Sequence, residues 1–563
     1  MSITLEQRYS KLETFPHYYE NESYVFLGPA SLTAEDACFD CFKKTVEFND
    51  SHFYLSLTRD YETDHYNQLV EEIVKGSDCS DFKNTVYILN KADLSITIKK
   101  IYINPSCPSC SQIYIPYDFH EHYQEKTPLN DDGRVMPFSE ICSVLQNNMN
   151  YLVDLDTGVG KKLYRDAESD LVPMYGIESF FGNTHFNSYG RSKGIVNSKY
   201  SAVLEMIERF SSMVPHFKKK IFSSFQSLIE KGIDTVDPRE LILPNSSIKW
   251  EQRSKFNIER EYYWTEAYRL NDLKKVLIPE QVAYYNNQVL RKEERFIYET
   301  SNGTALGKTL KESILYGLFE AIERDHFLVH WYSKKLPRLV DIESIQNQDV
   351  KQLIQFLDFS GYETYLFDIT LETNITAIWV LCRSKNKENY LHIYNAAGCH
   401  YDPEKAIFAG LVEAATSVIV YNKKLKNEIE HIEHLINNPT NVREMEDHVN
   451  YYALFQNEGN FHYLFKNLPF MEKVSVMDMR PDFELSYDSI LQKISEHHPN
   501  IYVIDMSNPL TEHLNLKVSK VIVPTLQTMT FGMQNERINQ SRLEKFGGSL
   551  EDVQLRKEPH PFP

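Results

Sequence analysis

Two short motifs of the form Glu-x-x-Glu-Arg constrain this chain more than any other feature of its sequence. One occupies residues 205–209 and the other residues 320–324, and both have the core Glu-x-Ile-Glu-Arg. Apolar residues at helical spacing surround each motif, so each is predicted to lie on a helix. Side chains three and four positions apart share one face of a helix, which places Ser201, Glu205 and Glu208 together.

Paired carboxylates on one helix face need a cation. On an exposed helix they repel each other by about 0.2–0.5 kcal/mol, and among apolar neighbours the cost is higher unless positive charge lies between them. Mg2+ prefers carboxylate and phosphate oxygens, and arginine suits phosphate. Two such helices facing each other would bind a metal-bridged polyphosphate. The competing interpretation is two solvated helix faces, because Glu and Arg are common there.

A familiar phosphate loop does not account for such a site. Residues 303–309, Gly-Thr-Ala-Leu-Gly-Lys-Thr, resemble a P-loop but have three residues between the glycines instead of four. We reject this interpretation, because the phosphate cradle depends on loop length. No Gly-x-Gly-x-x-Gly follows a strand in the amino-terminal part either, so a dinucleotide fold there is unsupported.

Alternating helices and strands from about residue 150 onward predict an α/β or α+β fold. The expected helices span residues 200–213, 311–331 and 403–421, with Pro403 suited to a first turn. The expected strands span residues 376–383, 391–396, 501–506 and 517–526. A chain of 563 residues that is 42% apolar is long enough for two or three domains.

The overall charge argues against two classes of partner. The net charge is −19, and both nucleic acids and anionic membranes require a basic face. No apolar stretch reaches the length of a membrane span, and the start of the chain lacks the pattern of a secretory signal. We therefore expect a cytoplasmic protein that binds neither nucleic acid nor membranes.

Residues 1–125 are predicted to form a separate small module, followed by a linker at residues 126–149. A hairpin is expected from residues 85–89 and 95–103, with a turn at residues 90–93. Two Cys-x-x-Cys pairs in this module could supply a closed, structural zinc site. The four cysteines are Cys38, Cys41, Cys107 and Cys110. The long separation between the pairs leaves a redox dithiol or unlinked cysteines as alternatives.

The residues around the carboxylate motifs resemble the signatures of the YcaO family. The segments that carry the resemblance are residues 190–211, 300–325, 398–415 and 521–527, within a match from about residue 150 to 563. The third departs from the family at residues 416–418, where many members carry Gln and Arg. The resemblance implies binding of ATP and Mg2+ without a P-loop. The ligands that it implies are Lys193, Ser201, Glu205, Glu208, Arg209, Asn302, Glu312, Glu320, Glu323 and Arg324, with Arg537 and Arg542 as further phosphate contacts.

The end of the chain resembles azoline-forming members of this family. It reads Pro559-His560-Pro561-Phe562-Pro563, and in those members the tail reaches into the active site. The implied reaction is the ATP-dependent cyclodehydration of Cys, Ser or Thr residues, with His560 and the carboxylate of Pro563 as candidate proton-transfer groups. A disordered tail is the alternative. Thioamide or amidine formation, and a scaffold with a vestigial ATP site, are the other functions considered.

The resemblance also implies partners. The cysteine module resembles the zinc-bearing part of an activating-enzyme-like domain whose nucleotide-binding half is missing, and no clear winged helix for leader recognition is present. We therefore expect a separate leader-binding protein, a ribosomal precursor peptide as substrate, and a homodimer. Thiopeptide or bacteriocin biosynthesis would be the setting, whereas the identity of the peptide is not encoded in these motifs.

Overall fold

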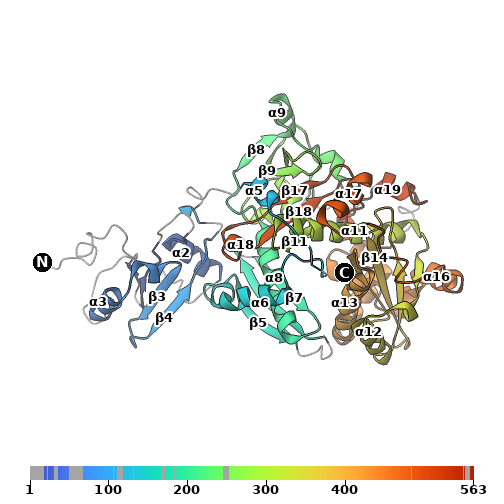
Figure 1. Ribbon diagram of the computed structural model, residues 1–563, viewed down its shortest axis with the longest axis horizontal. Helices are drawn as coiled ribbons and strands as arrows, with labels where there is room; N and C mark the ends of the chain where they lie inside the picture. The colour runs from blue at the N-terminus through green and yellow to red at the C-terminus, as the bar shows by residue number, and fades with distance from the viewer. Residues whose placement is uncertain are drawn as a thin grey trace.

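Four β-sheets and the helices packed on them make up the computed structural model of this chain (Figure 1). The amino-terminal sheet lies at one end, and the sheet that carries β14 lies with α12 and α13 at the other. The residues that the structure describes are 18–21, 23–30, 36–49, 67–104, 107–110, 118–130, 132–166, 172–182, 184–244, 253–483, 485–549, 551 and 558–562.

The amino-terminal sheet has four strands in the order β1-β2-β3-β4. Its elements are β1 (Tyr18–Glu20), β2 (Tyr24–Leu27), β3 (Thr85–Asn90), β4 (Ile96–Lys100), α2 (Phe39–Phe48) and α3 (Asn67–Gly76). Because strand side chains alternate between faces, Phe26 and Val86 pack with α2, whereas Val25 and Leu89 pack with α3. The predicted hairpin is confirmed by the antiparallel pairing of β3 with β4.

A three-stranded sheet, β5-β6-β7, supports the helix that carries the first carboxylate motif. Its strands are β5 (Gly160–Asp166), β6 (Met174–Phe181) and β7 (Thr184–Arg191), and the helices around it are α6 (Phe138–Asn147), α7 (Met149–Leu152) and α8 (Ile195–Met213). Helix α5 (Phe119–Gln124) packs instead against the six-stranded sheet described next. Residues Val203, Met206 and Ile207 of α8 are buried in a shared core with β6. Burial of this apolar side leaves Ser201, Glu205 and Glu208 on a less buried face of the helix.

A six-stranded sheet follows, in the order β10-β9-β17-β18-β11, with β8 paired to β9. Its strands are β8 (Ile221–Ser224), β9 (Glu261–Arg269), β10 (Lys274–Pro279), β11 (Thr304–Gly307), β17 (Tyr502–Asp505) and β18 (Lys517–Ile522). The helices attached to it are α9 (Phe225–Glu230), α10 (Glu280–Ala283), α17 (Tyr487–His497) and α18 (Pro509–His513). The proposed P-loop segment is thus partly strand β11, in agreement with its rejection.

The fourth sheet has the order β15-β14-β13-β12-β16. Its strands are β12 (Arg338–Val340), β13 (Tyr362–Asp368), β14 (Thr376–Ser384), β15 (Ile393–His400) and β16 (Lys473–Val474). The helices associated with this part of the chain are α12 (Gln348–Phe359), α13 (Pro403–Lys424), α14 (Ile429–Asn437), α15 (Met445–Tyr451), α16 (His462–Asn467) and α19 (Gln540–Glu544). The helices and strands predicted from periodicity are all present, with ends shifted by a few residues.

Helix α11 (Leu310–Ser333) joins the last two sheets. Its first half packs in a core with Val503 and Val521 of the six-stranded sheet, and its second half packs with Trp379 of the five-stranded sheet. Because it is buried on most sides, this helix is apolar around most of its circumference. The Glu320 motif lies near the middle of α11, between the part that packs on the six-stranded sheet and the part that packs on the five-stranded sheet.

The segment expected to be a linker differs from that expectation. Residues Ile141, Cys142 and Leu145 of α6 are buried in the core beneath α8. Their spacing of one, three and four positions is that of an apolar helix face. The polar residues just before α6 made this pattern hard to recognise. The segment therefore contains a helix that is part of the hydrophobic core.

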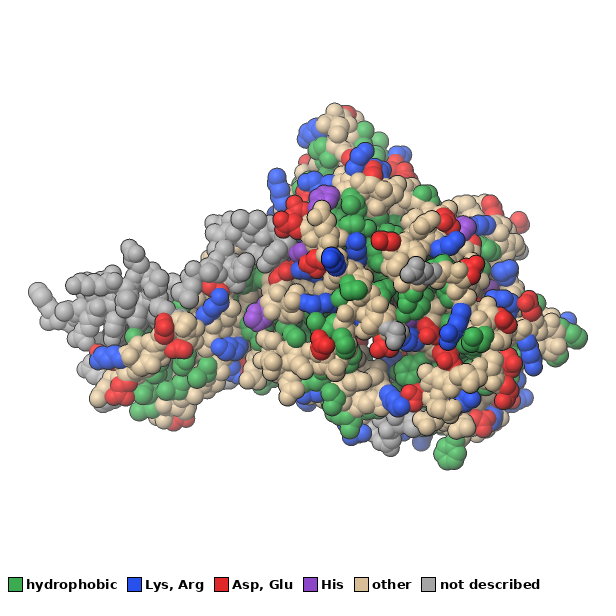
Figure 2. All heavy atoms as spheres, viewed as in Figure 1, with side chains coloured by type: hydrophobic (Ala, Val, Ile, Leu, Met, Phe, Trp, Pro, Cys, Tyr) green, Lys and Arg blue, Asp and Glu red, His purple; other side chains and the backbone are tan. Residues whose placement is uncertain are grey.

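On the face drawn in Figure 2, Lys and Arg side chains are interspersed with Asp and Glu. This distribution agrees with the acidic net charge, and it shows no broad basic surface on that face. Within the part of the chain that the structure describes, no helix has the length and apolar character needed to cross a bilayer.

Close packing of β7 against α8 generates a testable prediction. A Cβ on Gly190 would lie 1.9 Å from the carbonyl oxygen of Ser198 and 2.2 Å from the backbone nitrogen of Ala202. Gly190→Ala should therefore lower the free energy of unfolding by about 1–3 kcal/mol, measured by chemical denaturation. Gly194→Ala is the matched control, because a Cβ there meets nothing within 4 Å. Equal stability of the two variants would contradict this packing.

Candidate active site

The two Glu-x-x-Glu-Arg motifs face each other across the contact between α8 and the β11–α11 segment. Burial, together with the carboxylates of Glu320 and Glu205, raises the pKa of Glu208 well above its ordinary value. Burial likewise raises the pKa of Glu323 to about 7, with Glu320 adding to this effect and Arg324 opposing it. The four carboxylates thus form one cluster.

Charge in this cluster is not balanced by protein groups alone. Four carboxylates meet two guanidinium groups, since Arg209 lies 2.7 Å from Glu205 and Arg324 lies 3.5 Å from Glu323 and 3.8 Å from Glu320. Burial raises the pKa of Glu320, and Lys520 is a further cation that opposes this rise. When all groups are ionised, the four carboxylates still outnumber these cations, and a bound Mg2+ would offset the excess. Mg2+ takes carboxylate oxygens together with phosphate oxygens, so the donor set fits a magnesium-bound nucleotide.

Backbone amides hold two of the carboxylates in place. The N–H of Tyr189, on β7, donates to Glu205 at 3.0 Å, and the N–H of Gly303, just before β11, donates to Glu320 at 2.9 Å. Such charge-assisted bonds orient the carboxylates before any ligand binds. The helices position the motifs, and the adjacent strands set the rotamers of the side chains.

A third helix contributes a carboxylate that was not among the predicted ligands. Glu413, on α13, raises the pKa of Glu323, and its carboxylate lies 3.9 Å from the guanidinium of Arg191 at the end of β7. The sequence signal was available, because Glu413 lies in the third family signature. The Arg191–Glu413 pair leaves the charge excess of the cluster unchanged.

Arg134 is a further cation near the site. Its guanidinium stacks 3.4 Å from the ring of Tyr316 and lies 3.4 Å from Glu312, and it lowers the pKa of Glu208. The side chain of Asn130 accepts the backbone N–H of Arg134, which closes the turn that presents it. Because Arg134 lies in the segment taken for a linker, sequence reasoning missed it.

The other predicted nucleotide ligands are dispersed. Ser201 lies one turn before Glu205 on α8, and buried Glu312 accepts the N–H of Lys308 at 2.7 Å. Lys193 pairs with Asp349 of α12 at 2.5 Å on the surface. Asn302 and Arg537 line a cavity on another side of Arg324.

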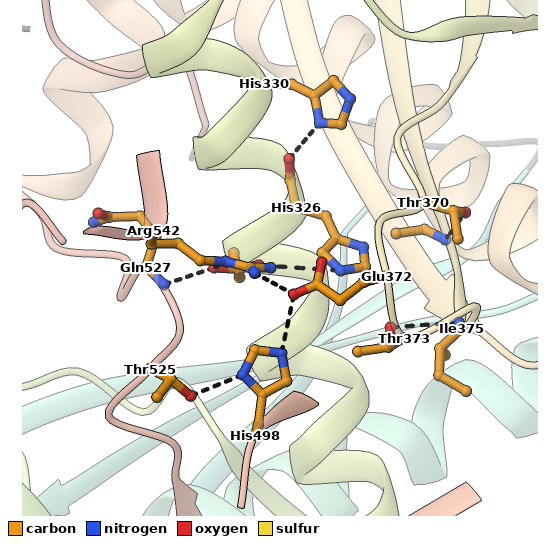
Figure 3. A network of polar contacts seen from close by, with 12 residues as sticks. His326, His330, Thr370, Glu372, Thr373, Ile375, His498, Thr525, Gln527 and Arg542 are labelled. Atoms are coloured by element: carbon orange, nitrogen blue, oxygen red, sulfur yellow. Dashed lines mark hydrogen bonds and ion pairs between the residues drawn. The ribbon is translucent and has the colours of Figure 1, made fainter. Parts of the chain in front are cut away.

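Arg542 lies apart from the cluster, in a buried polar network (Figure 3). Its guanidinium bonds to Asp325 at 3.0 Å, pairs with Glu372, and lies beside His498. The N–H of Gln527 also donates to Asp325, at 2.6 Å. With two carboxylates as partners, Arg542 connects α11 to the carboxy-terminal segment, and the expected phosphate contact has no support from this geometry.

The Pro-rich tail lies against Arg324. The ring of Phe562 is 4.0 Å from the Arg324 guanidinium and 4.9 Å from the ring of Phe327. Three hydrogen bonds fix the backbone and ring before it: Tyr452 donates to the carbonyl of Pro559, His448 bonds to the carbonyl of His560, and His560 bonds to the carbonyl of Thr530. The tail is therefore ordered as far as Phe562, and Pro563 lies outside the described residues.

His560, one of the two candidate proton-transfer groups, is buried against His448. Burial lowers the pKa of His560 well below its ordinary value, with nearby His448 adding to this effect. Its ring stacks on that of His448, with centroids 4.0 Å apart. His560 is therefore neutral at neutral pH, and its placement suits anchoring of the tail.

The four predicted cysteine ligands converge in the amino-terminal module. Their sulfur atoms all lie within 4.8 Å of one another, at 3.9 Å for Cys38–Cys41 and 3.4 Å for both Cys38–Cys107 and Cys41–Cys110. A tetrahedron with Zn–S bonds of about 2.3 Å has edges of about 3.8 Å. The arrangement fits one zinc ion held by four thiolates.

Unneutralised charge in the carboxylate cluster leads to a prediction. Glu208→Gln should raise the thermal unfolding midpoint in EDTA at a pH high enough to ionise Glu208, because the raised pKa of this carboxyl group means that its ionised form destabilises the fold. It should also abolish the rise in midpoint that Mg2+ and ATP cause in the unmodified protein. Glu388→Gln, at an exposed position, is the control. A lower midpoint for Glu208→Gln in EDTA would disprove the charge imbalance.

Comparisons with known proteins agree with this geometry. The family model described as YcaO cyclodehydratase, ATP- and Mg2+-binding, matches residues 189–527. An uncharacterized protein from Methanothermobacter thermautotrophicus is 23% identical over 351 residues, which cover 62% of this chain and 83% of that protein.

Similar solved structures cover most of the chain. A structure titled as a heterocyclase in complex with substrate and cofactor matches with a TM-score of 0.69 and 19% identity, over 95% of this chain and 78% of that one. The heterocyclase TruD matches at 0.57 with 18% identity, over 92% and 73%. The E. coli microcin synthetase McbBCD complex matches at 0.50 with 17% identity, over 71% and 96%. These structures share the fold of this chain. Because the family model matches more than half of the residues of this chain, the chain belongs to the YcaO family and is an ATP-dependent cyclodehydratase.

Proposed function

We propose that this enzyme converts Cys residues, or Ser and Thr residues, of a ribosomal precursor peptide into thiazolines or oxazolines. The observation that carries the proposal is the contact of Phe562 with Arg324, because it brings the Pro-rich end of the chain to the carboxylate cluster. A proline-rich segment is pre-ordered and loses little entropy when it docks. The heterocyclases that share this fold support the same class of reaction.

The reaction needs ATP because an amide oxygen is a poor leaving group. The substrate thiol or hydroxyl gives its proton to a base, attacks the preceding carbonyl carbon and forms the ring C–S or C–O bond. The resulting oxyanion then attacks the γ-phosphorus of ATP, and ADP leaves. Finally the C–O bond to the phosphoryl group breaks with its electrons, the amide nitrogen forms C=N, and its proton goes to a base.

In this scheme the described residues bind and orient. Glu205, Glu208, Glu320 and Glu323 would hold Mg2+, which neutralises charge on the phosphates. Arg209, Arg324 and Arg134 would contact phosphate oxygens, and Ser201, Glu312 and Lys193 are proposed nucleotide contacts. Lys193 would first have to exchange its Asp349 partner. We assign proton transfer to the carboxylate of Pro563 and anchoring of the tail to His560.

The amino-terminal module has a supporting role in this proposal. A zinc ion held by the four cysteines would stabilise the turn that carries Cys107 and Cys110 against α2. A separate protein would bind the leader peptide, in line with the McbBCD structure, which is that of a complex. A homodimer in the cytoplasm is the proposed state of the enzyme.

Removal of the Phe562 ring tests the role of the tail. Phe562→Ala should reduce ring formation at least tenfold, because the tail loses its contact with Arg324, while binding of ATP with Mg2+ changes less than threefold. Ring formation is measured as loss of one water per ring from the peptide by mass spectrometry, with ATP, Mg2+ and the partner protein present.

A matched control replaces another phenylalanine. Phe359 is 91% exposed, so Phe359→Ala should leave both measurements unchanged. A chain shortened by residues 559–563 gives a second reading if Phe562→Ala is poorly folded. Unchanged water loss in a shortened chain that still folds would rule out the proposed role of the tail.

Zinc is tested by metal analysis. The purified protein should contain one zinc per chain, and Cys107→Ser should lose it and unfold the amino-terminal module, as read by protease sensitivity. Cys142→Ser, at a buried cysteine outside the cluster, should keep the metal. Stoichiometric zinc in Cys107→Ser would exclude the four-thiolate site.

A further inference from the structure

A small cavity adjoins the carboxylate cluster on another side of Arg324. Its polar lining comes from Glu299, Asn302, Arg324, Lys520, Gln527 and Arg537. Its volume is about 50 Å3, enough for three or four waters at about 10–15 Å3 each. Ligand pockets for larger molecules measure about 300–1,000 Å3, so the cavity suits a small ion and excludes a nucleotide.

Buried donors in this cavity have unused capacity. Lys520 is 2% exposed, and its ammonium makes one hydrogen bond, to the carbonyl of Thr300 at 2.8 Å. Arg537 is also 2% exposed, and its Nη2 pairs with Glu299 at 3.0 and 3.2 Å. Its Nε has no hydrogen-bond partner among the described residues, and the same holds for Nη1 of Arg324, whereas Nε of Arg324 lies 3.5 Å from the Glu323 carboxylate. Buried donors without acceptors are costly.

The charges at the cavity favour an anion. Three cationic side chains line it, whereas Glu299 is its one carboxylate. Glu320 and Glu323 offset Arg324 from the neighbouring cluster. Burial lowers the pKa of Lys520, Glu299 opposes this effect, Arg537 adds to it, and Glu320 of the neighbouring cluster opposes it as well. An anion placed among Arg324, Lys520 and Arg537 would offset both the desolvation of Lys520 and the repulsion between cations.

We propose that this cavity binds inorganic phosphate, the anion released when the ring forms, and holds it on its way out of the active site. This inference rests on the proposed cyclodehydration. Elimination breaks the C–O bond, and the phosphate keeps the bonding electrons. Arg324 borders both the carboxylate cluster and the cavity, so a phosphate oxygen can remain in contact with one guanidinium while it passes from one to the other. Asn302 and Arg537 then serve product binding, and their sequence-predicted nucleotide role is reassigned.

Direct phosphate binding tests the site without peptide or turnover. The intact chain is titrated with inorganic phosphate by calorimetry, alone and then saturated with Mg2+ and a non-hydrolysable ATP analogue. We expect one phosphate per chain in both states. Lys520→Met should raise the dissociation constant at least tenfold and leave that of the ATP analogue within twofold. Lys275→Met, an exposed lysine of the same sheet, should bind phosphate normally.

Two results would overturn the proposal. Displacement of phosphate by the ATP analogue would make the cavity part of the nucleotide site, and unchanged phosphate affinity in a folded Lys520→Met variant would exclude the assigned donors. If that variant does not fold, Arg537→Lys keeps the charge but removes Nε, and should weaken phosphate binding severalfold. Because no ring formation is measured, failure here leaves the cyclodehydration test above unaffected, and failure of that test leaves the phosphate result readable.

Discussion

Repulsion among buried carboxylates at the contact of α8 with α11 is the constraint on which the rest of this structure depends. Burial and mutual proximity raise the pKa of Glu208 and of Glu323, so ionisation of these carboxyl groups in the apo fold carries a cost that a proton or a bound cation removes. Close backbone packing holds the carboxylates near one another. Gly190 lets α8 approach β7, and a Cβ added at Gly317 would lie 2.6 Å from the carbonyl oxygen of Gly303.

Helix α11 links the carboxylate cluster to the other parts of the molecule that contact it. One of its turns carries Glu320, Glu323 and Arg324 toward the cluster, and the next residue, Asp325, forms a buried ion pair with Arg542. That pair holds the segment leading to the tail, and the tail returns to Arg324 through Phe562. A single helix therefore connects the carboxylate cluster, the proposed phosphate cavity and the end of the chain.

Much of this could be predicted from local sequence. Apolar periodicity predicted the helices, strand and turn residues predicted the hairpin, and Cys-x-x-Cys spacing predicted the cysteine pairs. Each of these patterns lies within a short stretch of the sequence. Arg134 and Lys520 escaped prediction, because a lone cation in a polar turn or a strand carries no pattern until the fold brings it to the site. Arg542 was predicted to contact phosphate from the family resemblance. Its carboxylate partners, Asp325 and Glu372, could not be foreseen because they are distant in sequence.

By itself, the sequence determined the two carboxylate helices, the four-cysteine set, the Pro-rich end and the family to which the chain belongs, since each of these is a short pattern of residue types. Only the tertiary structure decided which cations join the carboxylates, that α6 is part of the core, and that Phe562 lies on Arg324. The reason is physical: helix faces and turns follow from neighbours in the chain, whereas charge balance and burial depend on groups that are distant in sequence and meet only in the folded state.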